Sequence, residues 1–113
     1  MAEMTLHVEL PKGADAPKLA QEAERRLAAL SDVEEVAAAP ESTRIAAEII
    51  AGIAITVSII KGSGEIADAL HKAIPKIKLV LRDLGLTNAQ VEVAGKQVPI
   101  DRVSRSHLQK MSS

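Results

Sequence analysis

Hydrophobic and polar residues alternate at the start of the chain. Residues 4–10, MTLHVEL, place apolar side chains at every second position, which is the period of a strand with one buried face. Asp15 and Pro17 provide a capping side chain and a first-turn proline, so we expect a helix to begin there. The apolar positions that continue this helix are Leu19, Ala23, Leu27 and Leu30.

Two further elements follow from the same patterns. A second strand is predicted over residues 34–39, and Pro40 ends it. Helical spacing returns over residues 66–84, where Pro75 predicts either a kink or two helices that meet near Ala73. Gly85 is placed to end this helical segment.

The end of the chain predicts a hairpin. Two short alternating segments, residues 89–93 and 97–100, flank Gly95, which supplies the positive φ that a tight connection requires. Pro99 cannot donate a ladder hydrogen bond, so its strand is expected at an edge of the sheet.

The most apolar stretch, residues 43–62, supports two interpretations. Its second part, IAITVSII, alternates and favours a strand, whereas its first part, TRIAAEIIAG, is rich in alanine and favours a helix. We expect one long helix, because only Gly52 separates the two parts, and its nearly all-apolar surface makes it either the central buried helix or part of an oligomer interface. The uncharged run of about a dozen residues is shorter than the roughly 20 that a bilayer requires, so no membrane span is predicted.

These elements give the order β-α-β-α-α-β-β. The simplest arrangement packs the helices on one face of a four-stranded sheet, so the expected fold class is α+β with a layout related to ferredoxin-like folds. A chain of 113 residues accommodates one domain. We place that domain at residues 1–103, followed by a C-terminal tail at residues 104–113.

Composition removes several classes of function. The chain has no Phe, Tyr, Trp or Cys, so it offers no ring for base stacking and no thiolate for catalysis or metal binding. Its 14 basic and 15 acidic residues give a net charge of −1, without the basic excess of nucleic-acid-binding domains. The acidic, alternating N-terminus does not resemble a signal or transit peptide, so a cytoplasmic location is expected.

No arrangement of titratable residues in the sequence points to catalysis. The histidines fall on different elements without a second ligand at metal spacing: His7, His71 and His107. Glu34 and Glu35 are adjacent on a predicted strand, and they therefore point to opposite faces. The glycines of residues 61–65 lack the spacing of a phosphate-binding loop.

Two remaining features lead to the same conclusion. The serines near the C-terminus, at positions 104, 106, 112 and 113, have no base beside them. Basic residues gather in KAIPKIK and at Arg82, where they could meet an acidic partner or a phosphate, but the nearby Asp68 and Asp83 favour a solvated helix face. We therefore expect a protein that is not an enzyme and that holds no metal or cofactor.

Three segments resemble a known family: LHVELPKGADAPKLAQEAERRLAAL, IAAEIIAGIAITVSIIKGSGEIADAL, and AQVEVAGKQVPI with its central Gly95. Over residues 4–108 the pattern is similar to that of the effector-associated constant component family (its first type). The resemblance implies a non-catalytic adaptor or regulatory module of bacterial conflict or defence systems. Its partner would then be an effector with a peptidase-like or caspase-like domain.

These observations favour a protein-interaction module. Its contact surface is expected on the apolar stretch and the edge strand, at Ile45, Ile49, Ile53, Val57, Ile60 and Val98. An effector protein is the expected partner, and the chain can also form a homo-oligomer. The alternative is a small-molecule or nucleotide-sensing domain that self-assembles, because ferredoxin-like layouts often bind ligands between sheet and helices.

Overall fold

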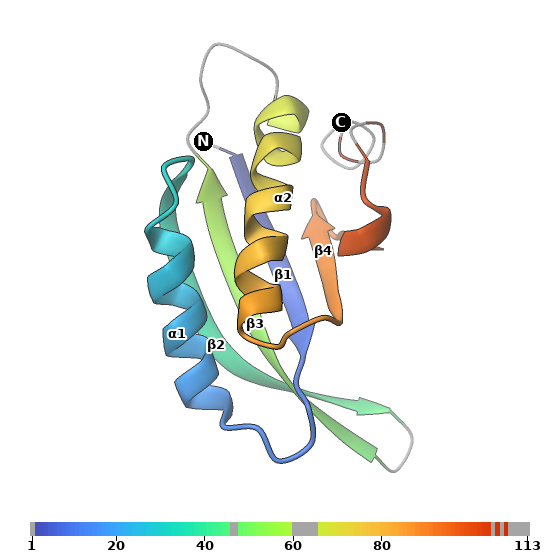
Figure 1. Ribbon diagram of the computed structural model, residues 1–113. Coiled ribbons are helices and arrows are strands. Elements are labelled where there is room, and N and C mark those ends of the chain that lie inside the picture. Colours follow the sequence, from blue (N-terminus) through green and yellow to red (C-terminus); the bar gives the residue numbers. More distant parts are fainter. Residues whose placement is uncertain (1, 46–47, 60–65, 105, 107, 109–113) are drawn as a thin grey trace.

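Strands with alternating apolar and polar residues form most of the fold, and two amphipathic helices cover one side of the sheet that they make (Figure 1). The computed structural model describes residues 2–45, 48–59, 66–104, 106 and 108. The elements follow one another as β1 (Ala2–Glu9), α1 (Ala16–Ala28), β2 (Val33–Ile45), β3 (Glu48–Ile59), α2 (Ile66–Asp83), β4 (Ala89–Val93), β5 (Lys96–Pro99) and the short 3-10 helix η1 (Ile100–Arg102).

The strands form one sheet in the order β2-β3-β1-β4-β5, and each neighbouring pair is antiparallel. Each helix consequently connects two parallel strands that have a third strand between them. This is the split arrangement of ferredoxin-like β-α-β-β-α-β units, with β5 added at the edge. The predicted α+β class is confirmed, but the sheet has five strands, where four were expected, and the predicted element order is wrong.

The error in element order comes from the predicted helix over residues 43–62. In the described part of this stretch, β2 continues to Ile45 and β3 begins at Glu48. The inward positions of β3 are fully buried: Ile53, Ile55, Val57 and Ile59. Burial of this alternating face outweighs the helix propensity of the alanines, because propensity is a weak preference that tertiary packing overrides.

β2 also passes the residue that was expected to end it. Pro40 lies within the strand and pairs with Ile53 of β3. Since β2 is an edge strand of the sheet, a residue without an N–H group is tolerated there.

Helix α2 is continuous through Pro75, so of the two alternatives expected there, a kink or two helices, the second is wrong. The ring of Pro75 is exposed to solvent. The helix stops at Gly85 (φ 76°), as predicted, because the N–H groups of Gly85 and Leu86 donate to the carbonyls of Arg82 and Leu81 in a Schellman motif. No helix within the described residues is both long and apolar enough to cross a membrane.

Two other local predictions are confirmed. The carboxylate of Asp15 accepts a hydrogen bond from the backbone N–H of Lys18 and caps α1. β4 and β5 form a hairpin with a two-residue connection, Ala94 and Gly95, which both have positive φ (54° and 82°). β5, which contains Pro99, lies at the edge of the sheet.

The core is aliphatic and lies between the sheet and the two helices. Its largest fully buried side chains include Met4, Leu6, Leu27, Ile53, Ile55, Ile59, Leu70, Ile77, Leu81 and Leu108. Leu108 belongs to the segment predicted to be a tail, yet none of its surface is exposed. The packed part of the chain therefore extends beyond residue 103.

Gly52 is required by the close approach of β3 to β1. A β-carbon at this position would lie 2.6 Å from the backbone carbonyl oxygen of Val8. We expect Gly52→Ala to lower the free energy of unfolding by about 1–3 kcal/mol, the usual cost of overpacking. The control Ala51→Ser, at an exposed position of the same strand, should change it by less than about 0.5 kcal/mol. Denaturant unfolding followed by circular dichroism measures both, and a Gly52→Ala variant as stable as the wild type would contradict the close approach.

The burial of Leu108 gives a second prediction. Leu108→Ala should lower the free energy of unfolding by about 2–5 kcal/mol, because it leaves a cavity in the core. Leu79→Ala is the matched control, since that leucine is 58% exposed and its truncation should cost less than about 0.5 kcal/mol. Equal effects of the two substitutions, measured by the same unfolding experiment, would restore the interpretation of this segment as a tail.

Candidate functional site

One face of the sheet is left uncovered by the described helices, since α1 and α2 both pack against the other (Figure 1). The outward residues of each strand form this surface, which we call the open face. Its described residues are Glu3, Thr5, His7 and Glu9 on β1; Glu35, Ala37, Ala39 and Glu41 on β2; Gly52, Ala54, Thr56 and Ser58 on β3; Gln90 and Glu92 on β4; and Gln97 and Pro99 on β5. The surface is acidic, with His7 as its only basic side chain among these residues.

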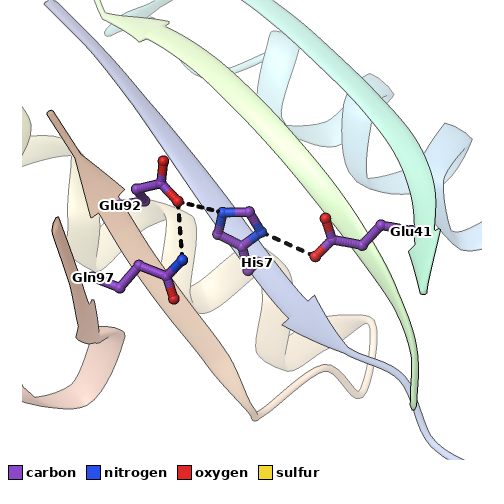
Figure 2. Close-up of polar contacts among 4 residues, drawn as sticks. All are labelled: His7, Glu41, Glu92 and Gln97. Atoms are coloured by element: carbon purple, nitrogen blue, oxygen red, sulfur yellow. Dashed lines mark hydrogen bonds and ion pairs between the residues drawn. The ribbon is translucent and has the colours of Figure 1, made fainter. Parts of the chain in front are cut away.

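On the open face, His7 lies between two carboxylates from other strands (Figure 2). Its Nδ1 is 3.0 Å from Oε1 of Glu41, and its Nε2 is 2.8 Å from Oε1 of Glu92. Gln97 donates from Nε2 to the same oxygen of Glu92 at 3.0 Å. We call these four residues the His7 cluster, and it connects β2, β1, β4 and β5.

The contact between His7 and Glu41 crosses an intervening strand. β3 lies between β1 and β2, and it places Ala54 beside His7 and Gly52 beside Glu41. Because these two residues have little or no side chain, the imidazole and the carboxylate can meet above β3.

The geometry of the His7 cluster requires a charged imidazole. Ionised carboxylates only accept hydrogen bonds, and a neutral imidazole has a single N–H group. Both ring nitrogens of His7 face a carboxylate oxygen, so both contacts are hydrogen bonds only when the ring carries two protons.

The pKa values follow from this geometry. Partial burial by itself lowers the pKa of His7, but the hydrogen bonds to Glu41 and Glu92 and their negative charges outweigh it and raise that pKa above its ordinary 6.5. The hydrogen bonds from His7 and Gln97 lower the pKa of the Glu92 carboxyl below its ordinary 4.5. The cluster therefore holds a proton on His7 and joins four strands of the sheet.

A second surface feature lies on the helix side, between α2 and η1. Two adjoining hollows of about 250 and 390 Å³ share Lys78, Arg82, Ile100 and Asp101 in their linings. The larger one is also lined by His71, Ile74, Pro75, Leu79 and Val103, and the smaller one by Leu81, Leu86, Thr87 and Ala89. We call the two hollows together the α2 groove. It combines apolar walls with charged side chains where the hollows meet.

Two of the six predicted interaction residues do not lie on the surface. Ile53 and Val57 are fully buried under the helices, so they cannot contact a partner in the folded chain. Ile45 and Ile49 lie in β2 and β3, and Ile60 lies outside the described residues. Val98 is half-buried on the edge strand β5, where it packs against the core. Assigning residues 43–62 to a helix thus misplaced Ile53 and Val57, which lie on the inward side of β3.

The other sequence candidates lie apart from one another. Glu34 and Glu35 are both exposed on β2, and His71 lines the α2 groove. Residues 61–65 and His107 lie outside the described part of the chain, as do the serines at 112 and 113. Within the described residues, no group of three or more His, Asp and Glu side chains is placed to hold a metal ion.

Sequence reasoning missed the His7 cluster because its members are distant in the chain. His7 and Glu41 are 34 residues apart, and His7 and Glu92 are 85 apart. One signal was present, since the alternation of β1 and β4 already assigned His7 and Glu92 to outward positions. Glu41 carried no such signal, because Pro40 was expected to end its strand.

Comparison with known proteins does not assign the chain to a family. Neither a scan against models of protein families nor a search of curated proteins finds a match. Among solved structures, a phage SAM lyase in its apo state is similar over 87% of this chain and 79% of the other, with 13% sequence identity and a TM-score of 0.46. A likeness of this size carries no argument about the function of this chain.

The His7 cluster predicts how stability depends on pH. A raised folded pKa of His7 stabilises the fold fully below pH 6.5, and this contribution is lost as pH rises through the folded pKa. A lowered pKa of Glu92 stabilises it fully above pH 4.5, and this contribution is lost as pH falls through the folded pKa. The stability added by the cluster should therefore be greatest between pH 4.5 and 6.5, measured as the difference between wild type and His7→Gln in denaturant unfolding.

Direct titration of His7 by NMR tests the cause of the shift. The pKa of His7 should lie above 6.5 in the wild type, and Glu41→Gln should lower it because one negative acceptor is removed. Glu34→Gln, which neutralises an exposed carboxylate outside the cluster, is the control and should leave the pKa of His7 unchanged. A His7 pKa that is insensitive to Glu41→Gln would contradict the contact across β3.

Proposed function

We propose that this chain is a non-catalytic, cytoplasmic protein-interaction module, an adaptor of a bacterial conflict or defence system that associates with an effector protein. Two observations support the proposal. The resemblance over residues 4–108 implies this role, and the α2 groove provides a surface for it. The effector carries a peptidase-like or caspase-like domain, by the same resemblance.

The exposure of Leu79 is the observation that carries the proposal. Its side chain is 58% exposed, and it is the one large hydrophobic residue with this much exposure among the residues whose side chains the structure describes, which leaves out residues 43–50 and 60–67. It does not stand alone, since Pro75 is exposed one helical turn earlier and both line the larger hollow with Ile74 and Val103. An apolar surface that is concave and bordered by charged residues is typical of a docking site.

The α2 groove replaces the surface that the sequence suggested. Ile53 and Val57 hold the sheet to the helices, and acidic substitutions there would test folding instead of binding. Leu79 and Pro75 are exposed on α2, so they can be changed while the fold is kept.

The size of the groove favours one alternative function. A hollow of about 390 Å³ falls within the range of pockets that hold small molecules, and Lys78 and Arg82 could pair with a phosphate or carboxylate group. The alternative is thus a small-molecule or nucleotide-sensing domain that self-assembles. A rise in melting temperature with one nucleotide or amino acid, removed by Arg82→Gln, would favour it over the adaptor.

Loss of the partner on substitution of Leu79 tests the adaptor proposal. Native mass spectrometry of the tagged chain, recovered from the cytosol of its host without detergent, should show a stoichiometric complex, with the partner identified by peptide sequencing. Leu79→Asp should weaken this complex about tenfold or more, because it places a charge at the centre of an apolar contact. Mass detection is suitable because the chain contains no Trp or Tyr to absorb at 280 nm.

The matched control is Gln21→Asp, which introduces the same carboxylate at an exposed position of α1. It should leave the complex intact, and both variants should keep the wild-type melting temperature. A complex that survives Leu79→Asp would remove the α2 groove as the docking surface. Absence of any stoichiometric partner would overturn the adaptor proposal itself.

A further inference from the structure

Positive charge borders the α2 groove. Lys78 and Arg82, which are both cations, line both hollows. The single carboxylate among the described lining residues belongs to Asp101. The charged residues of the groove therefore favour a ligand that brings its own negative charge.

Asp101 already places a carboxylate where the two hollows meet. Its Oδ1 lies 3.0 Å from Nζ of Lys78, and 71% of its side chain is exposed to solvent. This internal ion pair shows the position that a carboxylate takes beside the cations of the groove. An exposed pair of this kind contributes little to stability, so an incoming carboxylate can compete with Asp101 at small cost.

Arg82 lies next to this pair, exposed in the last turn of α2, and none of the ion pairs found among the described residues involves it. Lys76, by contrast, is paired with Asp32, and Nη1 of Arg26 lies 3.8 Å from Oδ2 of Asp83. A guanidinium group binds a carboxylate through two parallel hydrogen bonds, which gives direction as well as attraction. Arg82 is thus the cation of the groove that is available for a partner.

The apolar part of the groove is close enough to serve the same ligand. Pro75, Leu79 and Arg82 are spaced by four and three residues along α2, so they follow one another along one side of the helix. Ile74 and Ile100, which are 4% and 5% exposed, line the hollow beneath them. One short segment can therefore contact the apolar residues and Arg82 together.

The open face, on the opposite side of the molecule, disfavours binding of a negatively charged ligand. The open face carries five glutamates among its described residues, against a single histidine. An acidic segment is repelled there and attracted to the α2 groove, whereas a basic segment would be drawn to the open face.

We propose that the α2 groove binds an acidic segment of the partner protein, with an apolar side chain against Pro75 and Leu79 and a carboxylate paired with Arg82. This inference rests on the proposed function and specifies the chemistry of the partner. It commits to a protein segment, because the apolar walls require an anchor side chain that a nucleic acid or a free anion does not provide.

Binding of designed peptides to the full chain tests the inference. The first peptide is helical, with leucines at i, i+4 and i+7 and glutamates between them. The second replaces each glutamate with lysine, and the third keeps the glutamates and replaces each leucine with serine. Each carries one tryptophan, whose fluorescence is the only aromatic signal because the chain itself has no Phe, Tyr or Trp.

We expect the first peptide to bind about tenfold or more tightly than either of the others, and its affinity to fall as the salt concentration rises. Arg82→Glu should weaken the first peptide about tenfold and strengthen the lysine peptide, since the sign of the groove is reversed. Arg82→Gln, which keeps the helix terminus free of negative charge, should weaken the first peptide to a smaller extent. Lys18→Glu is the matched charge reversal on α1 and should change neither affinity.

Several outcomes would overturn the inference. They are equal binding of the glutamate and lysine peptides, an unchanged affinity in Arg82→Glu, tighter binding of a single-stranded RNA of equal length, or a homo-oligomer of the unliganded chain that Arg82→Glu dissociates. The adaptor proposal fails separately, when the native complex is absent or survives Leu79→Asp. If Leu79→Asp abolishes partner binding and Arg82→Glu does not, the α2 groove remains the docking surface, but the inference that its ligand is acidic is wrong.

Discussion

The antiparallel pairing of β1 with β3 is the interaction on which the rest of the structure depends. It aligns Leu6 with Ile55 and Val8 with Ile53, so one apolar strip faces both helices. The same register turns His7 outward and places it beside Ala54. A slip of one residue would direct the imidazole into the core and the leucine into solvent, because side chains alternate strictly between the faces of a sheet. Packing on one face and charge on the other are therefore fixed by a single register.

The two sides of the molecule consequently differ in charge and in chemistry. On the open face, small residues of β3 allow polar side chains of different strands to meet, and the His7 cluster joins β2 to β4 across the sheet. On the helix side, α2 presents cations and an exposed leucine beside η1. A chain with a formal net charge of −1 thus carries two surfaces of opposite sign.

Much of this fold was accessible from the sequence, wherever local signals agreed with one another. The alternation in β1, the Asp15 cap, the Gly85 stop and the Gly95 turn all predicted the elements that form. The prediction of a helix at residues 43–62 failed because two local signals conflicted. The contact that decides between helix and strand there joins residues that are distant in the sequence. Gly52 marks where the backbone of β1 approaches β3, and the sequence contains no sign of that partner. The candidate sites were even less accessible, since the His7 cluster and the α2 groove join residues from distant elements.

The central position of β1 has a consequence for how the chain is made. β1 comes first in the sequence, yet its two neighbours in the sheet, β3 and β4, extend to Ile59 and Val93. During synthesis, β1 leaves the ribosome with both of its edges unpaired, and it stays so until those later strands follow. Long-range pairings of this kind slow folding and leave strand edges exposed in the meantime. Charged and polar residues disfavour pairing of the unpaired β1 with β1 of other copies of the chain. They lie between its apolar positions, at Glu3, His7 and Glu9.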